Sequence, residues 1–327
     1  MRVLVEYCIC ILCIIQLVIL NIGVEGQRVI RVDQKGHGDF TTIQAAIDSV
    51  PSNNKKWVII LVKTGTYREK VKIPYDKPYV VMKGQGRKRT IVAWDDHQSI
   101  AQSPTFTSMA DNIVVKSIHF MNSYNNPGGT NKNPRVPAVA ALIAGDKSAF
   151  YRCKFSGVQD TLWDEQGRHY FYRCTIQGAV DFIFGSAQSI YESCVINTNG
   201  NALGPGVSGF ITAQGRTNPN DQTGFVFKYC VITGTGNNFL GRPWRQYARV
   251  IFYKSDLTSV IDPRGWDAWH FAGHEGQVTF AENGCFGSGS DTSRRVRWEK
   301  KLNPQTVQQL TRISYIDKEG WLKRQPY

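Results

Sequence analysis

Several common signals are missing from this sequence, and each absence narrows what the protein can be. Beyond residue 26 there is no CxxC pair and no His/Cys cluster with metal-ligand spacing, so a structural zinc site is disfavoured. The chain contains no Asn-x-Ser/Thr acceptor for N-glycosylation. Between Pro51 and Lys301 no long helical period appears, which disfavours a mainly helical fold.

The N-terminal segment contains one apolar run, which is too short for a membrane span. The run extends from Tyr7 to Leu20 after the basic Arg2 and is interrupted by Gln16. A spanning helix needs roughly 20 apolar residues. We therefore interpret residues 1–26 as a secretory signal peptide rather than a membrane anchor, and we expect residues 27–327 to form a soluble extracellular protein.

Acidic residues are scarce relative to basic ones. Without residues 1–26 the chain carries 38 Lys and Arg against 24 Asp and Glu, because Arg2, Glu6 and Glu25 leave the totals of 39 and 26. The balance of +14 implies an anionic partner, and outside the cell an acidic polysaccharide is favoured over nucleic acid or acidic lipid. A solvated basic face without a partner is the alternative that charge leaves open.

The first structural element expected is a strand, followed by a short helix. Asp39, Thr41 or Thr42 can cap a helix that begins near Ile43, and Pro51 ends it. We expect this helix to close one end of the fold. Short β-branched and aromatic runs broken by Gly, Pro and Asp follow it.

The middle of the chain repeats a six-residue pattern around a cysteine. Phe150–Phe155, Phe171–Ile176, Tyr191–Ile196 and Phe227–Ile232 align, and their cysteines step by 21, 20 and 36 residues. A period near 20 with short strands predicts a parallel β-helix, in which coils stack and equivalent positions form ladders. Leucine-rich repeats share the period but need a leucine ladder, which this chain lacks.

The cysteines of the repeat are predicted to form a buried inward stack. The five beyond residue 26 are Cys153, Cys174, Cys194, Cys230 and Cys285. Adjacent coils lie about 4.8 Å apart, which allows either disulfides or free thiols. Because five is odd, at least one thiol stays free or pairs between chains.

Two aspartates share one ladder position. Asp160 lies seven residues after Cys153, and Asp181 lies seven after Cys174. Carboxylates on adjacent coils lie close enough that both cannot ionise comfortably, so one pKa rises and the other group stays charged. The pair can supply an acid beside a nucleophile or base, although stacked aspartates also serve as ladder caps.

The motifs around the pair resemble those of the plant pectinesterase (pectin methylesterase) family. They are Gly65-Thr66-Tyr67-Arg68-Glu69, Gly157-Val158-Gln159-Asp160-Thr161-Leu162, Gly178-Ala179-Val180-Asp181-Phe182-Ile183-Phe184-Gly185, Thr212-Ala213-Gln214-Gly215-Arg216 and Leu240-Gly241-Arg242-Pro243-Trp244. The resemblance covers residues 27–327, without an inhibitor-like pro-domain. It implies an all-β fold, a single-stranded right-handed parallel β-helix with a short N-terminal helical cap and a C-terminal tail packed on the helix.

The resemblance also implies catalytic roles for three residues. Asp181 corresponds to the nucleophile that attacks the methyl ester of a galacturonate unit and forms an acyl-enzyme. Asp160 corresponds to the general acid for departing methanol and then the general base for water. Gln159 corresponds to an oxyanion donor. No metal or organic cofactor is implied.

Four further residues are expected to bind substrate. Arg242 is expected to keep Asp181 ionised and to contact substrate, and Trp244 corresponds to an aromatic sugar platform. Thr105 and Phe182 are additional contact candidates. Tyr67 and Glu69, although part of a family motif, are expected to be structural.

The chain departs from the family pattern at one position. Where the family has a Gln opening a Gln-Ala-Val-Ala-Leu motif, this chain has Pro137, which offers neither a side-chain donor nor a backbone N–H. Loss of one oxyanion donor costs on the order of 10²-fold in rate unless another group replaces it. We expect an active enzyme with a remodelled oxyanion site.

The resemblance implies a secreted cell-wall enzyme whose substrate is methylesterified homogalacturonan (pectin). Proteinaceous pectinesterase inhibitors are candidate partners, a monomer is expected, and neither nucleic acid nor membrane is. Two other functions stay open: a lyase or polygalacturonase on the same fold, and a pectin-binding wall protein without turnover. Neither would release methanol.

Overall fold

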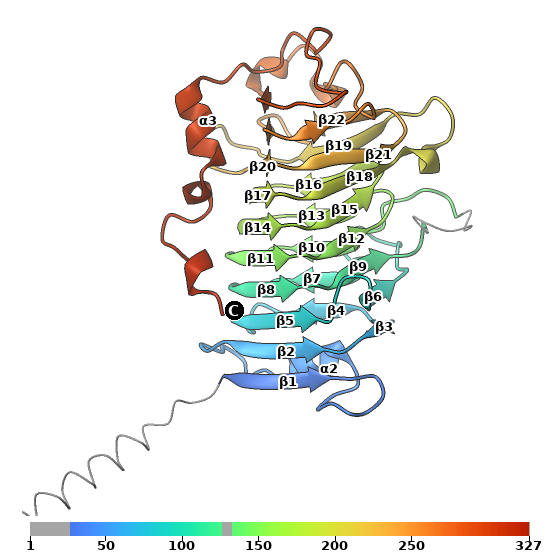
Figure 1. Ribbon diagram of the computed structural model, residues 1–327, viewed down its shortest axis with the longest axis vertical. Coiled ribbons are helices and arrows are strands. Elements are labelled where there is room, and N and C mark those ends of the chain that lie inside the picture. The colour runs from blue at the N-terminus through green and yellow to red at the C-terminus, as the bar shows by residue number, and fades with distance from the viewer. Residues whose placement is uncertain (1–26, 126–132, 327) are drawn as a thin grey trace, which may run out of the picture.

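The computed structural model describes residues 27–125 and 133–326 and contains three parallel sheets of ten, seven and eight strands. Each coil contributes one strand to each sheet in turn, and the coils stack in a right-handed sense into a parallel β-helix (Figure 1). The fold prediction is confirmed. The signal peptide assigned to residues 1–26 lies outside the described residues. No described helix is both long and apolar enough to cross a membrane.

Each sheet takes its strands from successive coils. The ten-stranded sheet A contains β1 (Arg28–Val32), β2 (Val58–Val62), β5 (Val80–Gly84), β8 (Ile113–Lys116), β11 (Ser148–Tyr151), β14 (Arg168–Tyr172), β17 (Gln188–Glu192), β20 (Gly224–Lys228), β23 (Arg249–Tyr253) and β25 (Thr279–Asn283). The eight-stranded sheet B contains β3 (Gly65–Tyr67), β6 (Thr90–Trp94), β9 (His119–Asn122), β12 (Lys154–Ser156), β15 (Thr175–Gly178), β18 (Val195–Asn199), β21 (Val231–Thr235) and β24 (Asp256–Leu257). The seven-stranded sheet C contains β4 (Val71–Ile73), β7 (Phe106–Ser108), β10 (Ala141–Ile143), β13 (Leu162–Asp164), β16 (Val180–Gly185), β19 (Gly209–Gln214) and β22 (Asn238–Pro243).

Aromatic ladders fill the interior of the helix. One inward row of sheet A stacks five rings on successive coils: Phe150, Phe171, Tyr191, Phe227 and Phe252. Neighbouring ring centroids are 4.5 to 5.0 Å apart. The coil spacing of a parallel sheet, about 4.8 Å, imposes this distance, and burial of large rings stabilises each coil on the next.

The predicted helix closes the N-terminal end. Helix α2 (Ile43–Asp48) begins after Thr42, whose side chain accepts a hydrogen bond from the Ala45 N–H. The carboxylate of Glu69 accepts from the N–H groups of Ile43 and Gln44 at 2.9 Å each. Glu69 therefore satisfies two free donors of the first turn, which is the structural role expected for it.

The cysteine ladder lies at the corner between sheets A and B. The five cysteines are free thiols, and all except the partly exposed Cys285 are buried. Each thiol donates to a backbone carbonyl of the preceding coil, for example Cys174 Sγ to Phe150 O at 3.3 Å and Cys194 Sγ to Phe171 O at 3.4 Å. The stack is confirmed, and the choice between disulfides and thiols is settled in favour of thiols.

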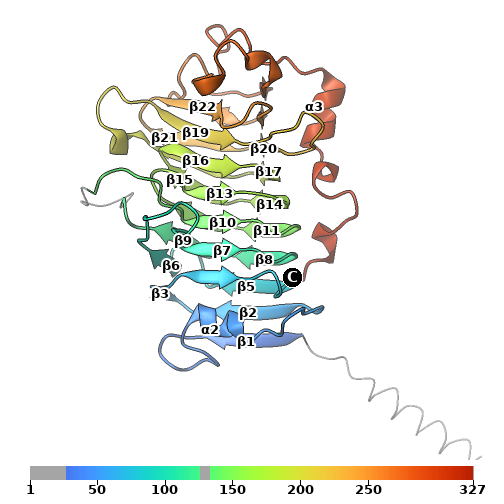
Figure 2. The ribbon, with the colours of Figure 1, turned by 180° about the vertical axis from the view of Figure 1, so that it is seen from behind.

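The C-terminal tail runs back along the outer face of sheet A (Figure 2). It contains α3 (Pro304–Thr311), η4 (Ile313–Tyr315) and η5 (Leu322–Arg324). Three other 3₁₀ turns lie in loops: η1 (Gly200–Leu203), η2 (Trp269–Phe271) and η3 (Glu275–Gln277). The buried residues of the tail pack on β11, β17, β20, β23 and β25 of sheet A.

Candidate active site

Asp160 and Asp181 lie at the start of two neighbouring sheet C strands. Gln159 bridges to Val180, and the Asp160 N–H donates to Val180 O at 3.0 Å, so the two aspartates occupy adjacent coils. The pairing of β16 with β19 shifts register between Val180 and Ile183. This bulge turns the chain locally at Asp181, as bulges beside functional sites commonly do.

Both aspartates have left-handed backbone conformations, which are uncommon outside glycine. The φ angle is +58° at Asp160 and +47° at Asp181. The motif glycines three residues earlier make room for the turn, because a Cβ on Gly157 would lie 2.7 Å from the Thr161 Oγ1 atom and one on Gly178 would lie 2.2 Å from the Phe182 Cβ. The G-x-x-D spacing thus follows from packing within one coil.

Arg242 binds Asp181 through two parallel hydrogen bonds. Its Nε donates to Oδ1 of Asp181 at 2.8 Å, and its Nη2 donates to Oδ2 at 2.6 Å. The guanidinium lies between two aromatic rings, with its carbon 3.9 Å from the ring centroids of Phe210 and of Trp269. Planar stacking on both faces fixes the orientation of the guanidinium, so the fork is pre-organised on the carboxylate.

Sequence reasoning missed the two rings that hold Arg242. Phe210 belongs to β19, whereas Trp269 opens η2 in the segment between β24 and β25 and has a φ of +46°. No spacing rule links these positions to Arg242 or to the aspartates. A non-glycine residue with positive φ beside a functional cation is the signal that could have identified Trp269, but it is visible only in the structure.

The environment separates the protonation of the two carboxyl groups. Burial raises the pKa of Asp160 well above its ordinary value, and the adjacent charge of Asp181 adds to this effect. Burial also raises the pKa of Asp181, but the hydrogen bonds and charge of Arg242 oppose it. Asp160 is 8% exposed and Asp181 7% exposed, so solvent screens neither effect strongly. The arrangement favours a protonated Asp160 beside an ionised Asp181.

The region expected to bind an oxyanion surrounds Gln159. Its side chain is half-buried and precedes Asp160 directly. Pro137 lies on the preceding coil, where the following residue, Ala138, donates its N–H to Gln159 O at 3.2 Å. Proline therefore keeps the strand pairing of this coil while offering no donor of its own.

Trp244 belongs to an aromatic surface on sheet C. It packs edge-on against Phe184, whose ring stacks on Trp163 with centroids 5.3 Å apart. Ile100 and Val139 pack against the same cluster. The half-exposed rings of Trp244 and Trp163 can stack on sugar units, whereas Phe184 is buried and packs against both of them. Sequence reasoning selected neither Trp163 nor Phe184.

Two expected substrate contacts lie in the interior instead. Thr105 is 0% exposed and its hydroxyl donates to Met121 O at 3.1 Å. Phe182 is also 0% exposed and belongs to the central core. Because neither side chain reaches the surface, we correct this part of the expectation and leave both out of the substrate-binding set. In the described part of the chain, no three His, Cys, Asp or Glu side chains gather as metal ligands would.

Comparison with known proteins gives consistent matches over most of the chain. A family model described as Pectinesterase matches residues 29–319. "Probable pectinesterase 29" from Arabidopsis thaliana is 64% identical over 306 residues, which are 93% of this chain and 91% of that protein. "Probable pectinesterase 55" from the same plant is 63% identical, covering 90% of each chain.

Solved structures of similar proteins share the fold. A pectin methylesterase from carrot superposes with a TM-score of 0.84 at 32% identity, covering 93% of this chain and 98% of the other. A pectin methylesterase from Aspergillus niger gives a TM-score of 0.75 at 28% identity, with 92% and 96% covered.

Proposed function

This chain belongs to the pectinesterase family, and from that premise we propose that Asp181 and Asp160 carry out its ester hydrolysis as nucleophile and acid/base. The protein is a carboxylic ester hydrolase that removes methyl esters from pectin. The observation that carries the assignment is the buried pair on adjacent coils, of which one member alone has an arginine bound to both oxygens.

The first half of the reaction forms an acyl-enzyme. An ionised oxygen of Asp181 attacks the carbonyl carbon of a methylesterified galacturonate unit, and the carbonyl oxygen becomes an oxyanion. As the tetrahedral intermediate collapses, the carbon–oxygen bond to the methoxy group breaks and Asp160 gives its proton to that oxygen. Methanol leaves, and Asp181 is joined to the sugar carboxyl as an anhydride.

The second half returns the enzyme to its starting state. Asp160, now ionised, takes a proton from a water molecule whose oxygen attacks the acyl carbon. The bond to Asp181 breaks, so Asp181 is again ionised and Asp160 is again protonated. The new carboxylic acid of the sugar then loses its proton to solvent and becomes galacturonate. The raised pKa of Asp160 suits it to both steps.

Gln159 is the proposed donor to the oxyanion, through its side-chain amide. Its place directly before Asp160 and its half-buried side chain support this role. Arg242 keeps Asp181 ionised. Trp244 and Trp163, both packed on the buried Phe184, provide a stacking surface for the sugar chain. The substrate is methylesterified homogalacturonan, which becomes pectate.

The proposed setting is the cell wall. We propose that residues 1–26 are removed as a signal peptide and that the enzyme acts as a secreted monomer in cell-wall modification. Proteinaceous pectinesterase inhibitors are the proposed protein partners. The excess of basic residues and the family membership support these assignments.

A methanol-release assay on methylesterified pectin tests the roles. Because both positions have positive φ, Asn is the suitable replacement, since it adopts this conformation more readily than Ala. Asp181→Asn should abolish release, and Asp160→Asn should lower kcat by about 10²- to 10⁴-fold. Undiminished activity in either folded variant would overturn the assignment.

Product analysis separates the alternatives. An unsaturated uronate would indicate a lyase, and new reducing ends would indicate a glycosidase. Binding of pectin without methanol release would favour a non-catalytic wall protein. The ionised Asp181 fixed by Arg242 favours turnover.

A further inference from the structure

A second charged surface lies at the corner between sheets A and B. It consists of seven cationic residues, here called the cationic edge: Lys83, Arg87, Lys88, Lys116, Arg152, Lys154 and Arg173. Lys83 and Lys116 pair on neighbouring strands, and Tyr151 and Tyr172 continue their row on the next two coils. Arg152 and Arg173 are the residues directly after these two tyrosines. Four successive coils thus carry a cation each, over about 14 Å of helix axis.

The cations of this edge have no acidic partners among the described residues. Several other surface cations have carboxylate partners, as in Arg68–Asp95, Lys70–Asp96 and Arg168–Asp146. On the edge, Lys116 donates instead to Pro326 O at 3.0 Å and Arg87 donates to Arg173 O at 3.0 Å. An uncompensated row of positive charge favours binding of an anion.

Repulsion within the edge is visible in two partly buried lysines. Burial lowers the pKa of Lys116, and the charge of Lys83 lowers it further. The pKa of Lys154 is lowered in the same way by burial and by Arg87. Negative charge placed here relieves repulsion as well as forming new contacts.

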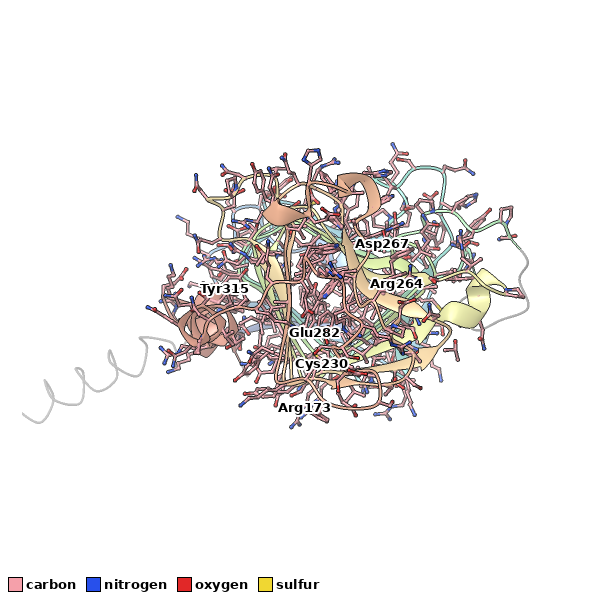
Figure 3. The ribbon with its side chains drawn as sticks, turned by 90° about the horizontal axis from the view of Figure 1, so that it is seen from above. Arg173, Cys230, Arg264, Asp267, Glu282 and Tyr315 are labelled. Atoms are coloured by element: carbon pink, nitrogen blue, oxygen red, sulfur yellow. The ribbon has the colours of Figure 1, made fainter. Side chains whose placement is uncertain are left out.

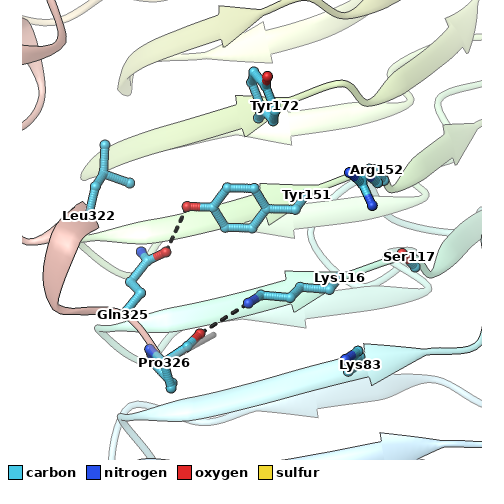
Figure 4. A pocket seen from close by; sticks show the side chains of 9 residues that line it. All are labelled: Lys83, Lys116, Ser117, Tyr151, Arg152, Tyr172, Leu322, Gln325 and Pro326. Atoms are coloured by element: carbon cyan, nitrogen blue, oxygen red, sulfur yellow. Dashed lines mark hydrogen bonds between the residues drawn. The ribbon is translucent and has the colours of Figure 1, made fainter.

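Two hollows flank the corner. One has a volume of about 480 Å³ and lies between the tail and sheet A (Figure 4). It is lined by Lys83, Lys116 and Arg152 together with Tyr151 and Tyr172. The other, of about 380 Å³, lies on sheet B and is lined by Arg87, Lys88, Ile91, His119, Lys154 and Thr175. Among residues 27–125 and 133–326, no carboxylate lines either hollow.

The edge lies away from the catalytic pair. The view along the β-helix axis shows Arg173 on the opposite side of the β-helix from Asp267 (Figure 3). The charge of Asp267 raises the pKa of Asp181, so Asp267 lies near the catalytic pair. The aspartates belong to the sheet C face, whereas the edge joins the other two sheets. An anion bound at the edge therefore does not cover the catalytic pair.

We propose that the cationic edge is a second polysaccharide site, which binds a de-esterified stretch of homogalacturonan. The identity of the polymer rests on the proposed function, because that reaction creates one carboxylate per sugar along a linear chain. A row of cations along the helix axis suits such a chain. The exposed ring of Tyr229, which is 48% accessible, continues the same corner row and can stack on a sugar.

Binding of polygalacturonate to a triple variant tests the site. Lys88→Gln, Arg152→Asn and Arg173→Asn remove three exposed cations, and Asn suits the φ of +54° at both arginine positions. The full chain, expressed with its own N-terminus in a secreting host, should lose about tenfold in affinity for polygalacturonate at low salt. Methanol release from a short, fully methylesterified oligogalacturonide should be unchanged.

A matched variant controls for net charge. Lys35→Gln, Lys55→Gln and Arg297→Gln remove three exposed cations from outside the edge, and should change affinity by less than about twofold. Equal losses in both triple variants, or none in the edge variant, would contradict the proposal. Equally tight binding of sulfated dextran or DNA at the edge would contradict its assignment to uronate. Each result is independent of whether methanol is released.

Discussion

At the residue scale, the two catalytic candidates combine an unfavourable backbone with an unfavourable charge environment. Both aspartates have positive φ and both are almost fully buried. Such features cost stability and persist where function requires them. Asparagine at either position keeps the backbone preference and removes the charge, so substitution separates the cost of the carboxylate from that of the turn.

Asp160→Asn should therefore stabilise the protein at neutral pH while it lowers activity. The pKa of Asp160 is raised in the folded state, so folding favours the protonated form. The contribution of Asp160 to wild-type stability is fully present below the pKa of an unfolded Asp, about 3.9. It is lost as pH rises through the raised pKa of the folded state. The variant should melt a few degrees above wild type at pH 7, with a smaller difference at pH 4.

Thermal denaturation of both proteins between pH 4 and pH 8 measures this difference. Asp76→Asn, which replaces a half-buried carboxylate between β4 and β5 near the N-terminal end of the β-helix, provides the comparison. A gap between Asp160→Asn and wild type that shrinks as pH rises would show that the sign is wrong.

Pro137 gives a second prediction at this scale. Because its neighbour Ala138 retains the hydrogen bond to Gln159, a glutamine side chain can replace the proline without disturbing the strand pairing. Pro137→Gln should raise kcat by up to about 10²-fold, since it supplies a second oxyanion donor. Methanol release with saturating substrate checks the change. Release that is absent in folded wild type and normal in the variant would mean that no remodelled site exists.

At the element scale, the ladder determines which features a sequence can reveal. The cysteine steps placed Asp160 and Asp181 on adjacent coils, because equivalent positions in a β-helix repeat at a nearly constant interval. Phe210 and Trp269 could not be found in this way. They reach Arg242 from a different coil and from a loop, and contacts of that kind depend on loop geometry rather than on period.

The same limit explains the error at Thr105 and Phe182. Family motifs identify residues near a site, but they do not say which side of the strand faces solvent. At Asp181 the bulge changes the alternation of side chains, and Phe182 packs inward beside Gly178. A one-residue change of register is enough to move a side chain from surface to core.

The thiol ladder leads to a prediction about reactivity. Burial raises the pKa of Cys285 to about 11 and raises those of Cys153, Cys174 and Cys194 well above the ordinary value. Since the thiolate is the reactive form, a thiol reagent at pH 8 should label at most the partly exposed Cys285 in the native protein. After denaturation all five described cysteines should react. Fewer than five without a reductant would indicate a disulfide.

At the scale of the whole molecule, the three faces of the helix are used differently. Sheet A packs against the tail, sheet C carries the proposed catalytic pair, and the corner between A and B carries the cationic edge. The outward apolar residues of sheet A are explained by this division. Ala149, Ile190, Val226, Ile251 and Ala281 form one outward row beneath the tail.

The division predicts that weakening the tail costs stability without affecting catalysis. Trp321 is 3% exposed, packs in the cluster beneath the tail and donates its indole N–H to Ile316 O at 2.8 Å. Trp321→Ala should lower the free energy of unfolding by about 3 to 5 kcal/mol, the usual cost of deleting a buried tryptophan. The matched variant Phe286→Ala removes a ring that is 57% exposed and should cost far less. Denaturant midpoints measure both.

The effect on catalysis is measured as methanol release at a temperature at which Trp321→Ala is still folded. Because the tail lies on sheet A and the aspartates on sheet C, kcat for methanol release should equal that of wild type within about twofold, the effect expected when no transition-state contact is lost. A large loss of kcat in the folded variant would mean that the tail and the catalytic pair are coupled through the stacked coils. The three faces would then form one functional unit rather than separate surfaces on a rigid support.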